Sequence, residues 1–541
     1  MAEKGAIQVL SQLDPTTART NSIADLRLCM GLASGGHRVE LIVPAASAPD
    51  DAQGIFELYG IEPSFDIRYV ASPPEPNERR RMARLVRHHG KLALSGGEAR
   101  VVISRDVRLL VPYLSAARLP ASRLLAVPWL HEFRDRPLER WVCRKAACVL
   151  ATNSAIVRSL ESRGVGAEST FVTGNPVPRT RVEFGRSCSR EEARERVGLD
   201  PSRQVVAYTG KLYKGMRELD YLLAAARCLP EALFVLTGGQ PGVVAGLERE
   251  LFANGMSNVH LTGLLPSPED IRFYQQAADV LVSYYSRHDH PYAHHNLPNK
   301  LAEYMTTGNP VVSADFPAVR DLLHDGNSIL VAPEEPERLV AGIQAALGAG
   351  SSGLAMRAQA KIAAESSEAV GARVGAFLAR RSAPVVRAQH RRSNVAAIIS
   401  NEIIALELSA FLERHYGSRQ GEAVLDLGAG TKPYAALYEP YFGSSTSVDV
   451  DYSPHDTRAV DTLASADALP FGDGSFDCVV CTEVLEHCRR PQVVLGEIFR
   501  VLRPGGRLFL STPFLRPLHE MPHDYFRFTP SSLRGLAEDA G

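Results

Sequence analysis

The sequence predicts an α/β protein in which three doubly wound parallel sheets follow one another along the chain. Three observations support this prediction. With 541 residues the chain is too long for a single hydrophobic core. Short apolar runs alternate with amphipathic stretches of helical length, which is typical of a parallel sheet wrapped by helices. Two polar stretches divide this alternation into three series.

The first two series predict two tandem domains, at residues 1–180 and 181–380. We expect a helix from Ser22 to Ser34 in the first domain. Its strand-like runs are AIQVL, HRVELIVP, ARVVISR, RLLAVPWLHEF, CVLATNS and TFVTGNP. After RSCSREEARERVGLDPSRQ, the second domain contains VVAYTG, ALFVLTGG, NVHLTG, DVLVSYY, PVVSA and SILVA.

A basic linker is predicted at 381–399, before a third domain at 400–541. The linker stretch RRSAPVVRAQHRRSN has no apolar periodicity. A helix near Asn401 to His415 and the runs AVLDLG, STSVDV, FDCVVC and GRLFLSTP follow it, and they indicate another α/β sheet.

Composition argues against several classes of protein. A formal net charge of -1 gives no reason to expect nucleic acid as a partner. No apolar run approaches the roughly eighteen residues that span a bilayer, and the first residues lack a signal-peptide core, so we expect a cytoplasmic protein. The 8 cysteines do not resemble a disulfide framework. Cys478 and Cys481 form a CxxC, but they lie on an apolar strand whose positions three apart face opposite sides, which disfavours zinc.

The segment HHNLPNKLAEYMTTGNPVVSAD indicates a phosphate-binding helix. Pro298 suits the first turn of a helix, Gly308 suits its end, and a buried strand follows. Asn299, Lys300 and Glu303 are therefore expected near the helix start, beyond the carboxyl ends of the strands. A helix N-terminus attracts a diphosphate, and a carboxylate there can accept hydrogen bonds from ribose hydroxyls. The segment predicts a nucleoside diphosphate ligand.

A second phosphate element is YTGKLYKGMRE. Gly210 follows a strand there, and Lys211, Lys214 and Arg217 cluster after it. Fixed cations and backbone N–H groups can stabilise the charge of a departing nucleoside diphosphate without a metal. We therefore expect no metal at this site.

In this order, these segments resemble the retaining nucleotide-sugar glycosyltransferases of the GT-B fold, family 4-like, over about residues 1–380. The resemblance rests on GHRVELIVP, TNSAIV, TGNPVP, GKLYKG, VLTGG, NVHLTGLLP and PNKLAEYMTTGNPVV. It implies two Rossmann-like domains facing a cleft, a nucleotide-sugar co-substrate and a glycan or glycolipid acceptor.

The same resemblance implies roles for single residues. Glu303 would bind the donor ribose, and His131 in PWLHEF would approach the donor sugar, so these two are the predicted catalytic side chains. Lys211, with Lys214 or Arg217, would bind the diphosphate. The remaining predicted nucleotide-sugar ligands are Gly210, Gly263 near the base, Lys300 and His295. His295 stands eight positions before Glu303, where the family has a glutamate, so the donor sugar stays open.

The stretch HDHPYAHH has two readings. His288, His290, His294 and His295 form either a metal site or a polar loop lining the cleft. We favour the loop, because the rest of the site implies metal-independent chemistry. His131 also has an alternative, as a hydrogen-bonded histidine at a strand end.

Basic residues gather in NERRRMARLVRHHGK. Arg79, Arg80, Arg81, Arg84 and Arg87 form either a peripheral contact with the inner face of an anionic membrane or a solvated helix face. The sequence leaves lipid-linked and soluble acceptors, and the oligomeric state, open.

The stretch VLDLGAGTKPY indicates a different cofactor. Asp426, Gly428 and Gly430 follow a strand, and Lys432 stands where a dinucleotide site has its third glycine. The DxGxG spacing suits a cofactor with an amino-acid tail, because the glycines let backbone amides approach a carboxylate and an aspartate can face an ammonium group. Asp449, at the end of the next strand, is placed to accept two ribose hydroxyls.

With SADALPFGDGSFDCVVCTEVLEH and EIFRVLRPGGRLFLSTP, these residues resemble the class I S-adenosylmethionine-dependent methyltransferases over about residues 400–541. The resemblance implies S-adenosylmethionine as cofactor, Asp467 and Ala468 beside the adenine, and Glu483 at the start of the loop facing the methyl group. Sheets of this class usually close with a helix and two further strands, whereas the sequence stops at SSLRGLAEDAG. We expect a Rossmann-like domain without its last strands: either the chain is incomplete or the edge strand is uncovered or covered by a partner.

Methyl transfer needs a positioned nucleophile and often a base. Candidates are His487 and, after the fifth strand, His519, His523 and Asp524. We predict His487 and His523 as catalytic, with a structural role as the alternative for each histidine.

These predictions combine into a bifunctional glycosyltransferase and methyltransferase of polysaccharide or glycoconjugate biosynthesis, in which the second activity modifies the glycan. One alternative is a glycosyltransferase whose last domain binds cofactor or partner without turnover. Another is a first part that binds a nucleotide sugar without transfer, since His295 replaces a glutamate.

Overall fold

The computed structural model divides into two compact units. Unit 1 comprises 1–113, 123–134 and 146–384, and unit 2 comprises 114–122, 135–145 and 385–541. The structure describes residues 6–11, 20–45, 53–59, 61–71, 82, 84–86, 88–89, 91, 93, 99–117, 124–265, 267, 270–348, 350–382, 395–416, 422–514 and 516–541. Most of the linker predicted at 381–399 lies outside the described residues.

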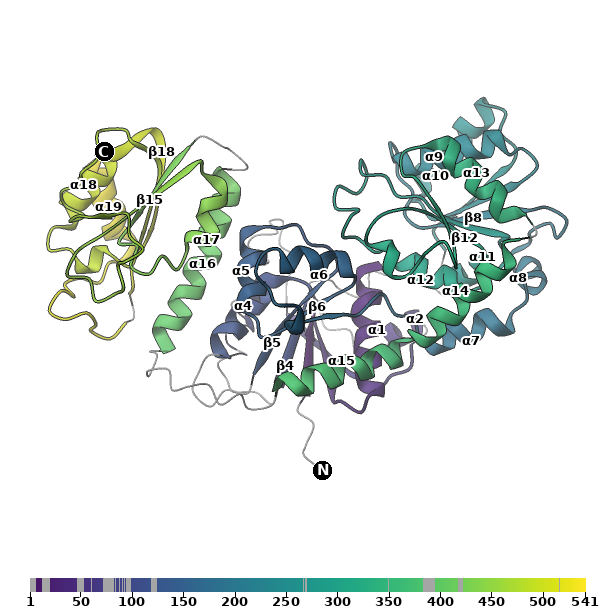
Figure 1. The fold of residues 1–541 in the computed structure, drawn as a ribbon, viewed down its shortest axis with the longest axis horizontal. Coiled ribbons are helices and arrows are strands. Elements are labelled where there is room, and N and C mark those ends of the chain that lie inside the picture. The colour runs from purple at the N-terminus through teal and green to yellow at the C-terminus, as the bar shows by residue number, and fades with distance from the viewer. Residues whose placement is uncertain are drawn as a thin grey trace. The chain divides into compact units, whose positions relative to one another are not determined.

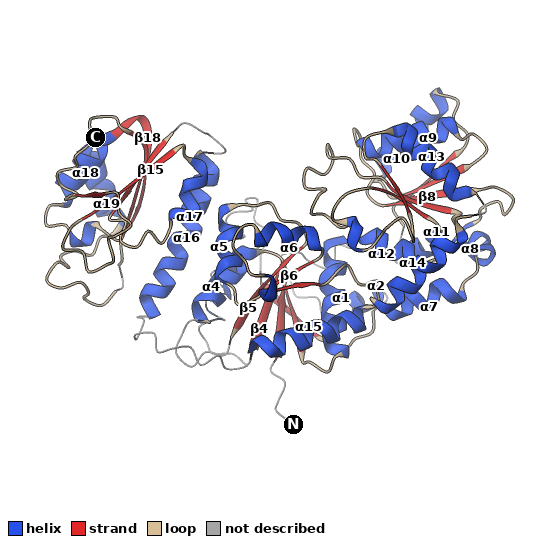
Figure 2. Ribbon diagram, viewed as in Figure 1, coloured by secondary structure: helices blue, strands red, loops and turns tan. Residues whose placement is uncertain are grey.

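The described residues form three sheets whose strands are all parallel, so the predicted α/β fold class is confirmed (Figure 2). Sheet 1, in unit 1, has the order β3-β2-β1-β4-β5-β6-β7. Its strands are β1 (Ala6–Leu10), β2 (Val39–Ala45), β3 (Asp66–Ala71), β4 (Ala99–Ser104), β5 (Leu125–Leu130), β6 (Val149–Ala151) and β7 (Thr170–Val172). All residues of β5 and β6 are buried, which explains their continuous apolar sequences.

Sheet 2, also in unit 1, has the order β10-β9-β8-β11-β12-β13. Its strands are β8 (Val205–Thr209), β9 (Leu233–Thr237), β10 (Val259–Gly263), β11 (Val280–Ser283), β12 (Val311–Ala314) and β13 (Ile329–Val331). The order reverses between β8 and β11, and in open α/β sheets ligands bind outside the carboxyl ends of the strands at such a point.

Helices cover both sheets of unit 1 (Figure 1). They are α1 (Thr20–Ser34), α2 (Gln53–Tyr59), α6 (Ser154–Glu161), α7 (Arg179–Ser187), α8 (Arg190–Val197), α9 (Arg217–Cys228), α10 (Pro241–Ala253), α11 (Ile271–Gln276), α12 (Asn299–Thr306), α13 (Pro336–Leu347), α14 (Ser352–Ala364) and α15 (Ser367–Ser382), while α4 (Val107–Ala116) runs from unit 1 into unit 2. The helix expected from Ser22 to Ser34 is present as α1.

The last helix of unit 1 returns to the first sheet. Helix α15 packs along α1, and Val370 and Val374 are buried in the core of sheet 1 (Figure 1). The two helices approach closely at Gly31 and Gly371: a Cβ on Gly31 would collide with the Ser367 backbone, and one on Gly371 would collide with the Gly31 backbone. The end of the second predicted domain therefore packs in unit 1 against the start of the first.

Unit 2 contains sheet 3, with the order β16-β15-β14-β17-β18. Its strands are β14 (Ala423–Leu427), β15 (Ser444–Asp449), β16 (Thr462–Leu463), β17 (Phe476–Thr482) and β18 (Leu502–Ser511). Its helices are α5 (Pro137–Lys145), α16 (Val395–His415), α17 (Ala435–Tyr438), α18 (Pro491–Val501) and α19 (Pro530–Ala540). The order of this sheet reverses between β14 and β17.

Within the part of the chain that the structure describes, no helix alone has the length and hydropathy to cross a membrane. The bent pair α13 and α14, at 92° to each other, meets that test by length and composition only. Leu339, Ile343, Ala358 and Ile362 of this pair are buried in the cores around sheet 2.

Candidate functional sites

Glu303 lies on α12 in a network of polar side chains. Arg27 Nη2 donates a hydrogen bond to Oε1 at 2.7 Å, and Gln275 Nε2 donates one to Oε2 at 3.3 Å. Burial alone would raise the pKa of this carboxyl, but Arg27 and Arg181 outweigh it and hold the pKa below its usual value. The structure thus gives Glu303 a negative charge balanced by arginine.

Lys300 lies one turn earlier on α12, next to the loop after β8. Its Nζ is 3.8 Å from Glu218 Oε1 and 3.8 Å from the centre of the Tyr208 ring. A Cβ on Gly210 would come within 2.9 Å of that Nζ and of Tyr208 Oη, so a larger residue here would displace these side chains. Gly210 and Lys300 are therefore brought together at the carboxyl end of β8.

The other predicted phosphate ligands are more exposed. Lys211 and Lys214 are exposed on the loop after β8, and Arg217 begins α9. The Arg217 guanidinium lies 4.0 Å from Asp220, and its side chain is 56% exposed. Gly263 ends β10, with a positive φ of 68°. Binding of a diphosphate by these cations stays a prediction.

His131 follows β5 and packs on Trp129, with ring centroids 4.3 Å apart. Burial, with a smaller effect of Arg105, lowers the pKa of His131 well below its usual value, so the imidazole is neutral. Its Nε2 is buried and makes no hydrogen bond to the described residues.

His295 bonds through both ring nitrogens to residues near the carboxyl end of sheet 1. Its Nδ1 lies 2.8 Å from the Phe133 carbonyl oxygen, and its Nε2 lies 2.8 Å from Ser159 Oγ. Asn153 Nδ2 donates to the His295 carbonyl oxygen at 2.8 Å. In this structure the ring is therefore held by protein groups, and its predicted contact with a donor sugar stays a prediction.

The histidines of HDHPYAHH are dispersed in the structure. His288 is exposed beside Asp289, His290 stacks on Tyr285 and His294 packs edge-on against Phe316. Among the described residues, the only group with metal-ligand spacing lies elsewhere, at Glu486, His487 and His519.

Unit 2 contains a cavity of about 780 Å³ at the carboxyl ends of β14, β15 and β17. The predicted cofactor ligands that line it are Asp426, Gly428, Gly430, Asp449, Asp467 and Glu483, together with the predicted catalytic His487 and His523. Ala468 follows Asp467 and is not one of the lining residues. The glycine loop, the second strand end and the loop after β17 thus meet around one cavity.

Two aspartates form one side of this cavity. Asp426 is buried and accepts a hydrogen bond from Tyr438 Oη at 2.7 Å. Burial raises the pKa of Asp426 to about 6, although the Tyr438 hydrogen bond and Lys432 oppose the rise. Asp449 accepts hydrogen bonds from the backbone N–H groups of Gly430 and Val450, both at 2.7 Å.

The loop after β14 requires glycine at position 428. The φ of Gly428 is 72°, and a Cβ there would collide with the Val484 side chain after β17. A larger residue would therefore push the two cavity walls apart.

Two other acidic residues that line the cavity are paired with arginines. Asp467 accepts hydrogen bonds from Ser465 Oγ at 2.6 Å and from Arg490 at 2.9 Å, and these bonds lower its pKa. Glu483 accepts a hydrogen bond from Arg516 at 2.9 Å and has a positive φ of 56°. Positive φ at a non-glycine residue is uncommon and is often associated with functional sites.

Sequence reasoning missed several residues that surround these sites. Arg27 and Gln275 reach Glu303 from distant segments, Glu218 pairs with Lys300, and Arg516 pairs with Glu483. Only Glu218 had a sequence signal, since it lies within the GMRE stretch after the predicted phosphate loop. The others depend on the fold.

Two family models match the chain. The model described as "Glycosyl transferases group 1" matches residues 203–348, and "Methyltransferase domain" matches residues 425–510. A similar curated protein is the ubiquinone/menaquinone biosynthesis C-methyltransferase UbiE of Vibrio cholerae serotype O1, 33% identical over 143 residues. That alignment covers 23% of this chain and 55% of the Vibrio cholerae enzyme. UbiE of Yersinia pestis is 34% identical, and its alignment covers 57% of that enzyme. The chain thus spans about half the length of these relatives.

Solved structures resemble the glycosyltransferase part. Anabaena Alr3699/HepE in complex with UDP and glucose is 20% identical with a TM-score of 0.52, over 69% of this chain and 99% of that one. Sucrose-phosphate synthase from Thermosynechococcus elongatus is 16% identical with a TM-score of 0.56, over 70% of this chain and 98% of that one. At these identities the likeness shows the fold alone. The matches together show a glycosyl transferases group 1 domain at residues 203–348, in a part of the chain with the fold of these solved structures, and a methyltransferase domain at residues 425–510.

Proposed function

We propose that the chain is a bifunctional transferase that moves a sugar from a nucleotide-sugar donor to a glycan or glycolipid, with retention, and methylates a glycan. The main support for this proposal is a difference in charge between two sites. Each site lies where the strand order of a sheet reverses, in sheet 2 and in sheet 3; the first is rich in cations and the second in carboxylates. Arg27, Arg181 and Lys300 act on the Glu303 site, whereas Asp426 and Asp449 line the unit 2 cavity.

The charges of unit 1 suit a nucleoside diphosphate. The ionised Glu303 can accept ribose hydroxyls, while Lys300 and the cations after β8 can neutralise phosphate oxygens. Charge that develops on the departing diphosphate would be stabilised by these fixed cations and by the start of α12. The neutral His131 is the candidate to contact the sugar. A solved structure of this fold is described with UDP and glucose, in agreement with such a ligand.

The charges of unit 2 suit S-adenosylmethionine, which would supply an electrophilic methyl group. Asp426 can face its ammonium group, Asp449 can accept its ribose hydroxyls and Asp467 can lie beside its adenine. His487 and His523 line the same cavity and are the candidates to take the acceptor proton while the acceptor forms its bond to carbon. A neighbouring groove of about 580 Å³, lined by Tyr525, Phe526 and Arg527 among others, is the proposed place for the acceptor.

The first experiment measures nucleotide release by the full chain with a panel of nucleotide sugars and glycan acceptors. We expect release with at least one donor, and we expect Glu303→Gln to lose it while Glu337→Gln, a change at an exposed glutamate of α13, retains it. Absence of donor-dependent release in the wild-type chain would contradict the transferase assignment.

A calorimetric titration of the full chain with S-adenosylmethionine tests the second activity. We expect saturable binding, and methyl transfer to the glycosylated product. Binding without methyl transfer to any product glycan would favour the alternative of a cofactor-binding scaffold. Peripheral contact with the inner membrane face also stays a proposal. Of its five arginines the structure describes Arg84 alone, which is exposed.

A further inference from the structure

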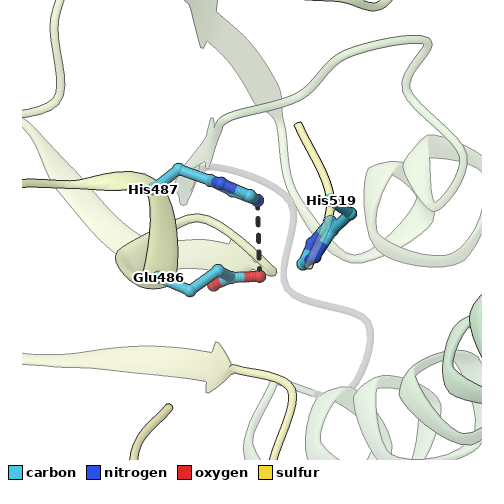
Figure 3. Close-up of side chains that lie close together, drawn as sticks. All are labelled: Glu486, His487 and His519. Atoms are coloured by element: carbon cyan, nitrogen blue, oxygen red, sulfur yellow. Dashed lines mark ion pairs between the residues drawn. The ribbon is translucent and has the colours of Figure 1, made fainter. Parts of the chain in front are cut away.

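A cluster of metal-ligating side chains lies at the edge of the unit 2 cavity, outside the residues expected to hold the cofactor. Glu486, His487 and His519 can each offer one ligand atom, and these atoms lie within 4.8 Å of one another. Glu486 and His487 come from a 3-10 turn after β17, and His519 comes from the segment after β18 (Figure 3). The fold therefore brings together two segments that are distant in sequence.

Glu486 makes the cluster unusual. Its side chain is 0% exposed, and neither carboxylate oxygen accepts a hydrogen bond from another described residue. The nearest polar partner given by the structure is His487 Nε2, 3.7 Å from Oε1 (Figure 3). The two nearby arginines are engaged elsewhere, Arg516 with Glu483 and Arg527 with Asp524. A buried carboxylate without hydrogen bonds is costly, and a bound cation would satisfy it.

Hydrogen bonds also orient the imidazoles as ligands. His487 Nδ1 lies 2.8 Å from the His523 carbonyl oxygen, and His519 Nδ1 lies 3.2 Å from the Pro517 carbonyl oxygen. A carbonyl can only accept, so Nδ1 of each ring carries the proton and each Nε2 presents a lone pair. Asp524 supports the same assignment at His519, 3.3 Å from Nδ1. Metal-ligating histidines characteristically donate their other ring N–H in this way.

Other polar atoms around the three side chains are also consistent with a metal site. His519 Nε2 is buried and makes no hydrogen bond to the described residues. Glu520 Oε2 is 3.6 Å from His487 Nε2, which places a second carboxylate beside the cluster. Backbone N–H groups of Tyr525 and Phe526 donate to the Glu486 carbonyl oxygen at 2.8 and 3.3 Å, and this ties the turn to the segment that carries His519.

We propose that Glu486, His487 and His519 bind one divalent transition-metal cation, in which case His523 alone stays the candidate to take the acceptor proton. Two imidazole nitrogens and one carboxylate oxygen are a ligand set that suits zinc and related first-row cations, and a three-ligand set leaves a position open. His487 and Glu520 also line the cavity, so the proposed cation would lie beside the space that the cofactor would occupy. Ligands of a tetrahedral zinc ion are about 3.3 Å apart, so binding draws the three side chains closer together.

The experiment uses the untagged full chain after dialysis against a chelator, titrated calorimetrically with Zn²⁺ and, in parallel, with Co²⁺ followed by visible absorption. We expect one saturable equivalent that Glu486→Gln and His519→Gln weaken at least tenfold. His288→Gln and Glu337→Gln, at exposed positions of unit 1, serve as matched controls and should bind as the wild type does. Zn²⁺ should also raise the unfolding temperature of unit 2, by mass action, in the wild type but not in the two cluster variants.

Glu486→Gln removes a buried carboxylate that accepts no hydrogen bond from another described residue, so we expect this variant to fold. Its unfolding curve without metal checks this directly. The proposal is overturned if no saturable equivalent binds, or if folded Glu486→Gln and His519→Gln bind the cation as tightly as the wild type. A titration of the same variants with S-adenosylmethionine separates the two questions, because cation binding can be lost while cofactor binding persists.

Discussion

The Glu303 site of unit 1 and the Asp426 site of unit 2 both place a buried carboxyl at the switch point of a parallel sheet, yet the protein treats the two carboxyls differently. Glu303 receives hydrogen bonds from Arg27 and Gln275, and its pKa is lowered despite burial. Asp426 receives one from Tyr438, and burial raises its pKa to about 6. Two arginines outweigh the burial of Glu303, whereas Lys432 and Tyr438 offset the burial of Asp426 only in part.

This difference shows how one sheet topology can serve opposite ligands. At Glu303 the surrounding cations leave a positive field that attracts phosphate, and the glutamate is oriented for hydroxyl groups. At Asp426 the effect of Lys432 does not outweigh burial, and a ligand with an ammonium group would bring further positive charge. The predictions below test this contrast.

Glu303→Ala should have the largest effect. The change leaves Arg27 largely buried without its partner, and breaking a fully buried ion pair costs about 3–5 kcal/mol of unfolding free energy, which is the upper limit here. The two side chains are only 17% and 11% exposed. Chemical denaturation of unit 1, together with donor-dependent nucleotide release, measures both consequences, and we expect release to be abolished.

A matched control is Glu365→Ala, which breaks an exposed pair with Arg373. Surface pairs contribute at most about 1 kcal/mol, so this variant should stay close to the wild type. Equal losses of stability in the two variants would show that Glu303 is not a buried, balanced charge.

Asp449→Asn should weaken S-adenosylmethionine binding by about ten- to a hundredfold. Asp449 accepts hydrogen bonds from Gly430 N and Val450 N, and an asparagine cannot replace both carboxylate oxygens as acceptors. Hydrogen bonds to charged groups contribute about 1.5–3 kcal/mol each. Titration calorimetry measures the change, and Asp451→Asn, at an exposed position two residues later, is the control. Unchanged affinity in Asp449→Asn would remove Asp449 from the cofactor site.

The sequence was sufficient to predict the three sheets and the local motifs at the ends of their strands. Apolar runs such as LAVPWL become fully buried strands, and Gly428 is required by the φ of its own turn. These features are encoded within a few neighbouring residues. The loops after β14, β15 and β17 could therefore be placed at one cavity from topology alone.

The partners of the site residues could not be predicted in the same way. Arg27 reaches Glu303 across 276 positions, and His519 joins Glu486 through a segment after the last strand. No local pattern marks such pairs, because only the packing of distant elements decides which side chains meet. The same holds for His295. The sequence shows that a histidine stands where the resembled family has a glutamate, but it does not show the contacts of that histidine with Ser159 and Phe133.

The affinity of unit 2 for S-adenosylmethionine should fall about tenfold between pH 7 and pH 5. With a pKa of about 6, Asp426 is mostly ionised above that value and mostly protonated below it, and only the ionised form attracts an ammonium group. The other charged groups that act on it are Lys432, Asp449 and Glu439. Titration calorimetry across this range measures the slope, and Asp426→Asn should flatten it. An equally steep slope in that variant would assign the titration to another group.

Ser159→Ala should have the smallest effect, and it asks whether His295 is an anchor or a sugar ligand. The change removes the 2.8 Å contact between Ser159 Oγ and His295 Nε2, and a hydrogen bond of this kind contributes about 0.5–1.5 kcal/mol. If the ring serves mainly to hold this segment, unit 1 loses that much stability while the preference among donor sugars is unchanged. Thermal unfolding and the nucleotide-release panel measure the two quantities, with the exposed Ser187→Ala as control. A changed donor preference with unchanged stability would instead make His295 part of the sugar pocket, because freeing its Nε2 would then alter what the site binds.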